Sequence, residues 1–180
     1  MFNILVKMDA DQKAFLQRVR EAMQDYFGAD QRRIDHALQV SCYAEELLSY
    51  IDADPVTTLA AAYLHDIGIQ AAEEKHGKTS GNLQEKEGPP IAQAILEKLN
   101  APEEMIAEVC DIIAHHHHPR ENDSMNFKVL YDADFIENLD ERRQNASLDG
   151  EDLSRIIENS LLTSSGKIEA RKLFLESKET

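Results

Sequence analysis

Two cysteines are all that the 180-residue chain contains, so disulfide bonds cannot be the main support of its fold. A chain of this length buries most of the surface that it exposes when unfolded, and it needs no covalent framework. Cys42 and Cys110 each lie within an apolar helical pattern, where a free thiol behaves as a small apolar side chain. We therefore expect both cysteines to be core residues without a catalytic role.

Long hydrophobic runs are also missing. The apolar opening, residues 1–6, is broken by Lys7 and Asp9. It is too short for the centre of a secretory signal, and far shorter than the roughly 20 residues of a membrane span. The sequence therefore predicts a cytoplasmic protein with no membrane partner.

Positive charge is scarce, because 19 lysines and arginines stand against 34 aspartates and glutamates and leave a net charge of −15. Such a charge repels nucleic acid polymers and anionic membranes, so we expect neither as a partner. A small phosphorylated ligand is compatible with it, because a bound divalent cation and a few local cations dominate the field at short range.

Period-two alternation, which would indicate a strand, is absent over any useful length, whereas apolar residues recur at three and four along most of the chain. The sequence therefore predicts an all-α fold in a single domain. The expected helices cover residues 11–27, 30–50, 55–64, 89–99, 101–116, 126–139, 153–162 and 167–175. The third of these is apolar on every side, which predicts a central buried helix.

Residues 68–88 show no apolar period and predict a long loop, with Pro89 and Pro90 at the start of the next helix. The lysines of this loop, Lys75 and Lys78, have two interpretations. They are either solvated charge or part of a mobile lid, residues 73–87, that closes over a neighbouring site and binds phosphate.

Three ionisable groups lie in or at the ends of apolar helices, where burial is costly without a partner. They are His36, the pair His65 and Asp66, and the pair Asp132 and Asp134. Each alone has an ordinary interpretation, as a satisfied histidine, a common dipeptide, or a capping pair. Adjacent residues point about 100° apart on a helix, so His65 and Asp66 can reach one ion only where the helix ends, and Gly68 permits that turn.

Taken together, these groups supply nitrogen and oxygen donors for an octahedral divalent cation with open positions for water. The order His36, His65-Asp66-Ile67-Gly68, Asp134 resembles the HD superfamily of metal-dependent phosphohydrolases, which is named after the dipeptide. The resemblance covers about residues 30–140. Further matching segments are Gly88-x-x-Ile91-Ala92, Val109-x-x-x-Ile113-x-x-His116-His117 and Ala133-Asp134-Phe135.

The resemblance implies a helical bundle with a metal in its core. The implied ligands are His36, His65, Asp66 and Asp134. Asp134 is preferred over Asp132 because the family pattern places a bulky residue after the ligand. Asp132 is then expected to contact the ligand side chains without binding the metal itself. Residues 30–140 would form the HD domain, residues 1–29 a helix packed on it, and residues 141–180 a helical extension of the same domain.

Four consecutive histidines, residues 115–118, cannot all face one site from a helix. In relatives with two metals, a histidine at the position of His116 ligates the second ion, together with a histidine four residues before the glycine, where this chain has Gln84. We therefore favour one metal, with His116 or His117 holding the phosphate or donating a proton. His115 and His118 are interpreted as a helix-terminus cap and a solvent-facing residue.

The implied reaction is attack of metal-bound hydroxide on a small phosphate ester, with a nucleotide among the candidates, and with Asp66, His116 and His117 as the catalytic residues. Arg33, with Arg32 beside it, is a substrate-binding candidate because arginine suits bidentate phosphate recognition. Two imidazole ligands favour Mn²⁺, Co²⁺, Ni²⁺, Fe²⁺ or Zn²⁺ over Mg²⁺. Two alternatives stay open, a di-iron HD-type oxygenase and a non-catalytic regulatory module that binds a metal or ligand. A homodimer is also left open.

Overall fold

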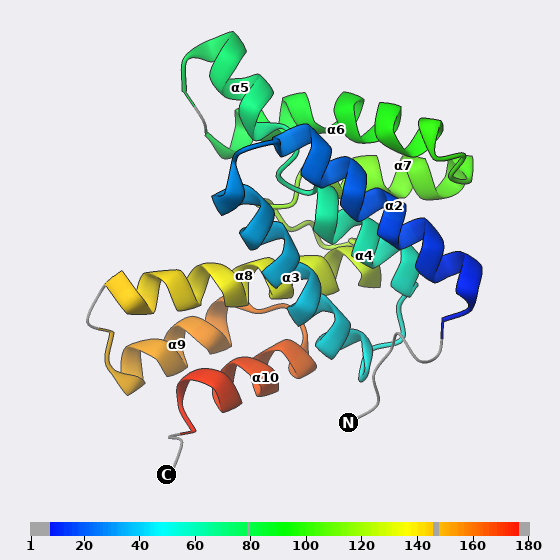
Figure 1. The fold of residues 1–180 in the computed structure, drawn as a ribbon. Coiled ribbons are helices and arrows are strands. Elements are labelled where there is room, and N and C mark those ends of the chain that lie inside the picture. The colour runs from blue at the N-terminus through cyan, green and yellow to red at the C-terminus, as the bar shows by residue number, and fades with distance from the viewer. Residues whose placement is uncertain (1–7, 79, 146–147, 177–180) are drawn as a thin grey trace.

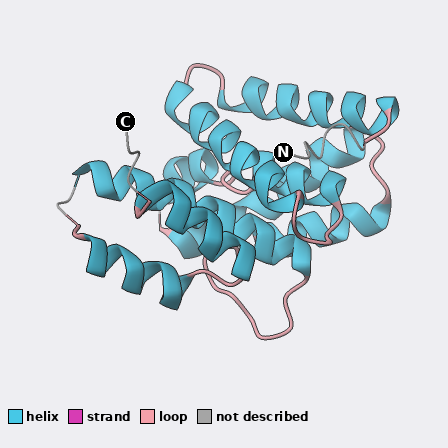
Figure 2. Ribbon diagram, turned by 90° about the horizontal axis from the view of Figure 1, so that it is seen from below, coloured by secondary structure: helices cyan, strands magenta, loops and turns pink. Residues whose placement is uncertain are grey.

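The computed structural model describes residues 8–78, 80–145 and 148–176. Within these ranges every regular element is a helix and no strand is present, which confirms the all-α prediction (Figure 2). The helices are α2 (Ala10–Phe27), α3 (Gln31–Leu48), α4 (Pro55–Leu64), α5 (Ile69–His76), α6 (Gly81–Lys98), α7 (Glu103–Ile113), α8 (Met125–Asn145), α9 (Gly150–Ser160) and α10 (Ser164–Phe174). No helix in these ranges is long and apolar enough to cross a membrane.

Helix α4 is the central helix, as its composition predicts. Every residue from Thr57 to Leu64 is buried. The helix packs against α2, α3, α7 and α8. Its start is set by Asp54, whose carboxylate accepts the N–H of Thr57 at 2.6 Å, and by Pro55 at the first helical turn. Because α4 is enclosed on all sides, the polar residues that follow it enter the interior of the protein.

Beside α3 and α4, helices α5, α6 and α7 form one group and α8, α9 and α10 form another. Helix α6 packs against α5 and α7, whereas α10 packs against α8 and α9. In Figure 1 the first group lies at the top and the second at the bottom. Helix α3 contacts both α4 and α8, so side chains from α3, α8 and the end of α4 can meet at one point.

The prediction of a long loop over residues 68–88 is wrong. Helix α5 begins at Ile69 and α6 already begins at Gly81, so Pro89 and Pro90 lie inside α6. The first turns of α6 bury polar side chains, among them Gln84 and Glu85, which bond to residues far away in the sequence. A helix whose buried face is polar shows no apolar period, which is why the pattern failed here.

Gly68 and Gly88 let the turn after α4 touch the backbone of α6. A Cβ atom on Gly68 would lie 2.2 Å from the Gln84 carbonyl oxygen and 2.5 Å from the Gly88 nitrogen. A Cβ on Gly88 would lie 2.7 Å from Ile113. The backbone of Gly68 has an ordinary negative φ of −77°, so close packing and not a special turn requires this glycine. This contact brings Gln84 next to the end of α4.

The expectation that both cysteines are core residues is wrong for Cys42, which is exposed. Cys110 is half-buried and packs against the core. Cys42 follows the buried Val40 and Ser41 on α3, but the buried stripe of that helix continues at Ala44. An apolar neighbourhood in the sequence therefore did not place Cys42 on the inner face, because the helix turns 100° per residue.

Candidate metal centre

The four residues that the sequence singles out as ligands meet at one point. His36 comes from α3, His65 and Asp66 follow α4, and Asp134 comes from α8. The Nε2 atoms of His36 and His65 lie 3.3 Å apart. An oxygen of Asp66 lies 3.6 Å and 3.5 Å from these two nitrogens. An oxygen of Asp134 lies 3.2 Å and 3.6 Å from them. We refer to these four residues as the metal cluster.

The spacing and chemistry of the metal cluster fit a divalent transition metal. Ligand bonds of about 2.1 Å place neighbouring donor atoms roughly 3.0 Å apart in an octahedron and roughly 3.4 Å apart in a tetrahedron. Each carboxylate oxygen lies 3.2–3.6 Å from both imidazole nitrogens, which is close to this range. Three members, His36, His65 and Asp66, have all their donor atoms within 4.8 Å of one another.

The imidazole of His65 is prepared for metal binding by its surroundings. Its Nδ1 lies 2.9 Å from the carbonyl oxygen of Ala62, to which it donates, so Nε2 presents a lone pair to the cluster. Burial lowers the pKa of His65, which keeps the ring neutral. Burial raises the pKa of the Asp66 carboxyl, but the neighbouring imidazoles outweigh it and hold this pKa well below its usual range. The cluster therefore combines a neutral nitrogen donor with an ionised carboxylate.

Asn138 is a supporting residue that the sequence reasoning did not single out for this role. Its side-chain amide donates to Asp134 Oδ1 at 2.8 Å, one helical turn along α8. The same oxygen faces His36 and His65. The amide therefore fixes which way the carboxylate of Asp134 points. The spacing of four residues on a predicted helix was the signal that could have revealed it.

Asp132 does not support the metal cluster, contrary to expectation. Its carboxylate is fully buried and accepts the backbone N–H groups of Leu162 and Thr163 at 2.7 Å and 2.9 Å, and the Thr163 hydroxyl at 2.6 Å. A Cβ on Gly166 would lie 2.3 Å from the same carboxylate. Asp132 therefore attaches the start of α10 to α8. Two residues along a helix point about 200° apart, so Asp132 and Asp134 could not face the same site.

A second group of donor atoms lies beside the metal cluster and shares Asp66 with it. Donor atoms of Asp66, His116 and His117 lie within 4.8 Å of one another. The amide nitrogen of Gln84 lies 2.9 Å from Asp66 Oδ1, 3.3 Å from His116 Nε2 and 3.2 Å from His117 Nε2. We call Asp66, His116 and His117 the second group. The side-chain amide of Gln84 occupies the space that a cation bound by this group would need.

The four histidines have separate surroundings. His116 is buried and its Nδ1 lies 2.9 Å from the Ile113 carbonyl oxygen, while His117 is held by buried Glu85, which accepts its backbone N–H at 3.0 Å. His115 stacks on Phe127 and bonds to Asp123 at 2.9 Å. His118 is exposed, as expected, and lies 3.0 Å from Glu85. Glu85, which the sequence reasoning missed, holds the second half of the turn, His117 and His118.

A cavity of about 410 Å³ opens onto the metal cluster, with His36 and Asp66 in its lining. Arg33 also lines it, and its guanidinium is paired with Asp30 at 2.8 Å and with Glu73 at 2.6 Å. The predicted substrate-binding residue Arg33 is thus next to the candidate ligands. The Arg33 side chain is 20% exposed, so its guanidinium can be reached from the cavity.

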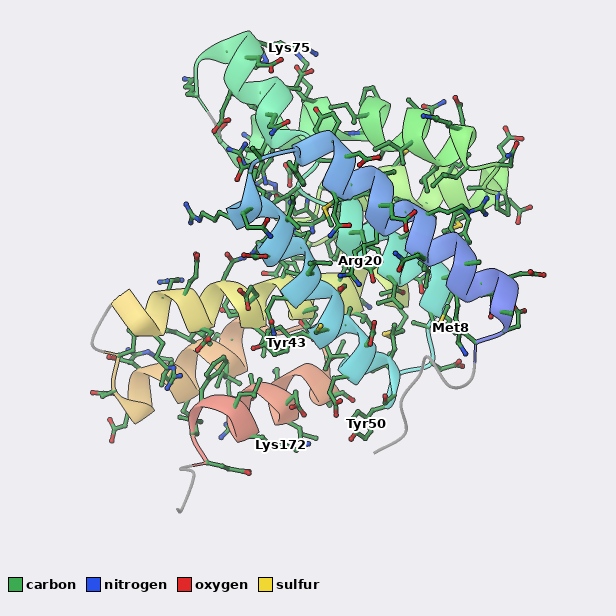
Figure 3. All side chains as sticks on the ribbon, viewed as in Figure 1. Met8, Arg20, Tyr43, Tyr50, Lys75 and Lys172 are labelled. Atoms are coloured by element: carbon green, nitrogen blue, oxygen red, sulfur yellow. The ribbon has the colours of Figure 1, made fainter. Side chains whose placement is uncertain are left out.

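The two lysines of the predicted lid are placed differently. Lys75 pairs with Glu87, and His76 bonds to the same carboxylate at 3.2 Å. Figure 3 shows Lys75 at the end of α5 that projects from the body of the protein. Neither Lys75 nor the exposed Lys78 lines the cavity at the metal cluster. The lid segment is largely helical in the described residues, since α5 and α6 include most of it.

Comparison with known proteins adds the decisive finding. The family model described as "HD domain" matches residues 33–156. The chain belongs to the HD domain family. The match spans all four residues of the metal cluster, as well as Gln84 and the four histidines. The HD dipeptide is His65-Asp66 in this chain.

The HD fold is also found in a similar solved structure. A crystal structure of a predicted HD superfamily hydrolase from an uncultured Thermotogales bacterium matches with a TM-score of 0.62 and 24% sequence identity. The match covers 95% of this chain and 90% of that chain, so the likeness extends to the helices outside residues 33–156. No curated protein gives a significant match.

Proposed function

We propose that this HD domain protein is a metal-dependent phosphohydrolase that acts on a small phosphate ester. One observation carries the proposal: the donor atoms of His36, His65, Asp66 and Asp134 converge at metal-binding spacing, and His36 and Asp66 line a cavity that Arg33 also lines. A divalent cation held there would supply a Lewis acid that withdraws charge from phosphoryl oxygens and acidifies water. Two imidazole ligands favour Mn²⁺, Co²⁺, Ni²⁺, Fe²⁺ or Zn²⁺ over Mg²⁺.

The side chains around the cluster have separate tasks in this proposal. Arg33 offers its planar guanidinium to the phosphate, which would replace Glu73 as its partner. His117 is 36% exposed and lies in the second group beside Asp66, outside the lining of the cavity, whereas His116 is 1% exposed and lies against Asp66. We assign to His117 the contact with the phosphoryl group and to His116 the support of Asp66.

The proposal includes one cation per chain. Within the described residues, the second group is a further candidate for cation binding, but Gln84 already places an amide nitrogen among its donor atoms. An amide NH₂ donates two hydrogen bonds, and a neutral imidazole or a carboxylate accepts them without a metal. The same contact argues against a two-metal oxygenase, the alternative that the second group would otherwise favour.

The test has two steps. The protein is stripped with a chelator, reloaded separately with Mn²⁺, Zn²⁺ or Fe²⁺ and analysed for metal, with one ion per chain expected in each case. The loaded protein is then assayed against phenyl phosphate and a set of phosphorylated metabolites for release of inorganic phosphate. Two irons per chain with oxygen consumption would replace the proposal by the oxygenase. A fully loaded protein that binds phosphate esters without turnover would replace it by a regulatory module.

A further inference from the structure

The cavity at the metal cluster has a wall whose chemistry restricts the substrate. We infer that the substrate is a phosphate monoester of a small polyhydroxylated or amine-bearing alcohol, such as a sugar phosphate, and that it is not a nucleotide. This inference rests on the proposed function and adds the chemical class of the alcohol. It depends on the side chains that line the cavity beyond the candidate ligands.

The phosphate end of the cavity is defined by the cluster and Arg33. Arg33 directs Nη1 to Asp30 and Nη2 to Glu73, so its two outer nitrogens already hold oxygen atoms. Because His36 and Asp66 line the same cavity, one phosphoryl group can contact both a cation at the cluster and this guanidinium. The second lining arginine, Arg32, is 84% exposed and pairs with Glu141 at 3.4 Å. The arrangement provides for a single phosphoryl group.

The rest of the lining consists of hydrogen-bonding groups. Asp30, Glu73 and Glu141 contribute carboxylates, and Asn138 contributes an amide. Carboxylates accept hydrogen bonds, and their natural partners are hydroxyl and ammonium groups. A polyhydroxylated or amine-bearing alcohol supplies several such donors. The volume of about 410 Å³ is that of a site for a small molecule.

A nucleobase finds no matching surface in this cavity. Bases are bound by stacking on aromatic rings or arginine guanidinium planes, or by burial against apolar side chains. Ile69 is the one aliphatic residue of the lining, and among the described residues no Phe, Tyr or Trp belongs to it. The aromatic ring in the lining is that of the candidate ligand His36, and its two guanidinium groups are paired with carboxylates. Polyphosphates are disfavoured as well, because the lining carboxylates and the net charge of −15 repel each added phosphate.

The decisive experiment uses two esters that differ at the anomeric carbon, which bears a hydroxyl group in one and adenine in the other. Ribose 5-phosphate and adenosine 5′-monophosphate share the ribosyl phosphate, and kcat/KM is measured for both with Mn²⁺-loaded protein. We expect ribose 5-phosphate to have the higher kcat/KM. A higher value for adenosine 5′-monophosphate would overturn the inference, because it would show that the protein uses the base.

Binding separates this inference from the proposed function. Calorimetric titration of both esters into the loaded protein compares affinities without turnover, and we expect ribose 5-phosphate to bind more tightly. If no ester, phenyl phosphate included, is hydrolysed while this order of affinity holds, the proposed function fails, and the inference holds for the ligand that the cavity binds but not for a substrate. If phosphate is released but adenosine 5′-monophosphate binds more tightly, the inference fails and the function stands.

Glu141→Gln tests the carboxylate wall directly. The substitution keeps the shape of the side chain but halves its capacity to accept hydrogen bonds, so KM for ribose 5-phosphate should rise severalfold. The KM for phenyl phosphate, which has no hydroxyl groups, should rise less. Glu97→Gln, at an exposed position that does not line this cavity, is the matched control. Equal increases in KM for the two esters would show that Glu141 does not bind the alcohol.

Discussion

The metal cluster and the second group are built from the same residue types and share Asp66, yet they differ in what lies between their donor atoms. In the second group the amide nitrogen of Gln84 lies within 3.3 Å of all three residues. In the metal cluster, two imidazole nitrogens 3.3 Å apart face two carboxylates, and Asn138 touches only Asp134 Oδ1 from the side. An amide with two N–H donors lies among the three residues of the second group, whereas in the described part of the chain the cluster has no such donor between its imidazoles and carboxylates and is suited to a cation.

The two oxygens of Asp66 face different groups. Oδ2 faces His36 and His65, while Oδ1 accepts the amide of Gln84. A carboxylate held in this way offers one oxygen to a cation at the cluster, while its other oxygen already accepts a hydrogen bond from the amide. The comparison teaches that residue type alone does not define a metal site, because a single neighbouring amide can satisfy the same donors.

The largest expected effect is loss of the metal. Asp66→Asn keeps the size of the side chain but removes the charge that both groups share, and an amide is a weak ligand for a transition metal. We expect the metal content to fall from about one ion per chain to background, as measured by elemental analysis after reloading and dialysis. Metal content equal to that of the parent would move the site away from the cluster.

Gln84→His should change the number of ions. The imidazole removes the amide that satisfies the second group and adds a nitrogen ligand, so we expect two ions per chain in the same analysis. Gln84→Asn, which keeps an amide, is the matched control and should retain one. One ion in the histidine variant, or two in the parent, would show that Gln84 does not decide the number.

Asp134→Asn and Asp132→Asn should separate metal binding from folding. Asp134 is a cluster residue, so its variant should lose more than about 100-fold in metal affinity, beyond the 10- to 100-fold typical of supporting residues. Asp132 binds Leu162 and Thr163, so its variant should lose about 1–3 kcal/mol of unfolding free energy in urea and keep its metal affinity. The reverse assignment of the two losses would make Asp132 the ligand.

Asn138→Ala should have the smallest effect. It leaves all four ligands in place but removes the amide that orients Asp134. We expect a loss of metal affinity of about 10-fold, with the number of ions unchanged. Gln93→Ala, which removes an exposed amide bonded to Glu97 on α6, is the control. An unchanged affinity in Asn138→Ala would mean that Asp134 holds its position without help.

Much of the fold follows from the sequence because it depends on local pattern. The apolar composition of residues 59–64 predicts a buried central helix, and the Asp54-Pro55 signal predicts where it begins. The same reasoning failed for residues 68–88, where the buried face of α6 carries Gln84 and Glu85. Burial of polar groups depends on partners from other helices, and no local pattern contains them.

For the candidate site, the sequence by itself determined the residue types and the order in which His36, His65-Asp66 and Asp134 occur. These positions are brought together because each lies on a helix that packs around α4 or at the end of α4 itself. Only the tertiary structure decided what Asp132 and Gln84 contact: Asp132 binds the start of α10, and the amide of Gln84 lies among the donor atoms of the second group. The physical reason is close contact between distant segments, above all the approach of Gly68 to the backbone of α6, which places the Gln84 amide beside the end of α4.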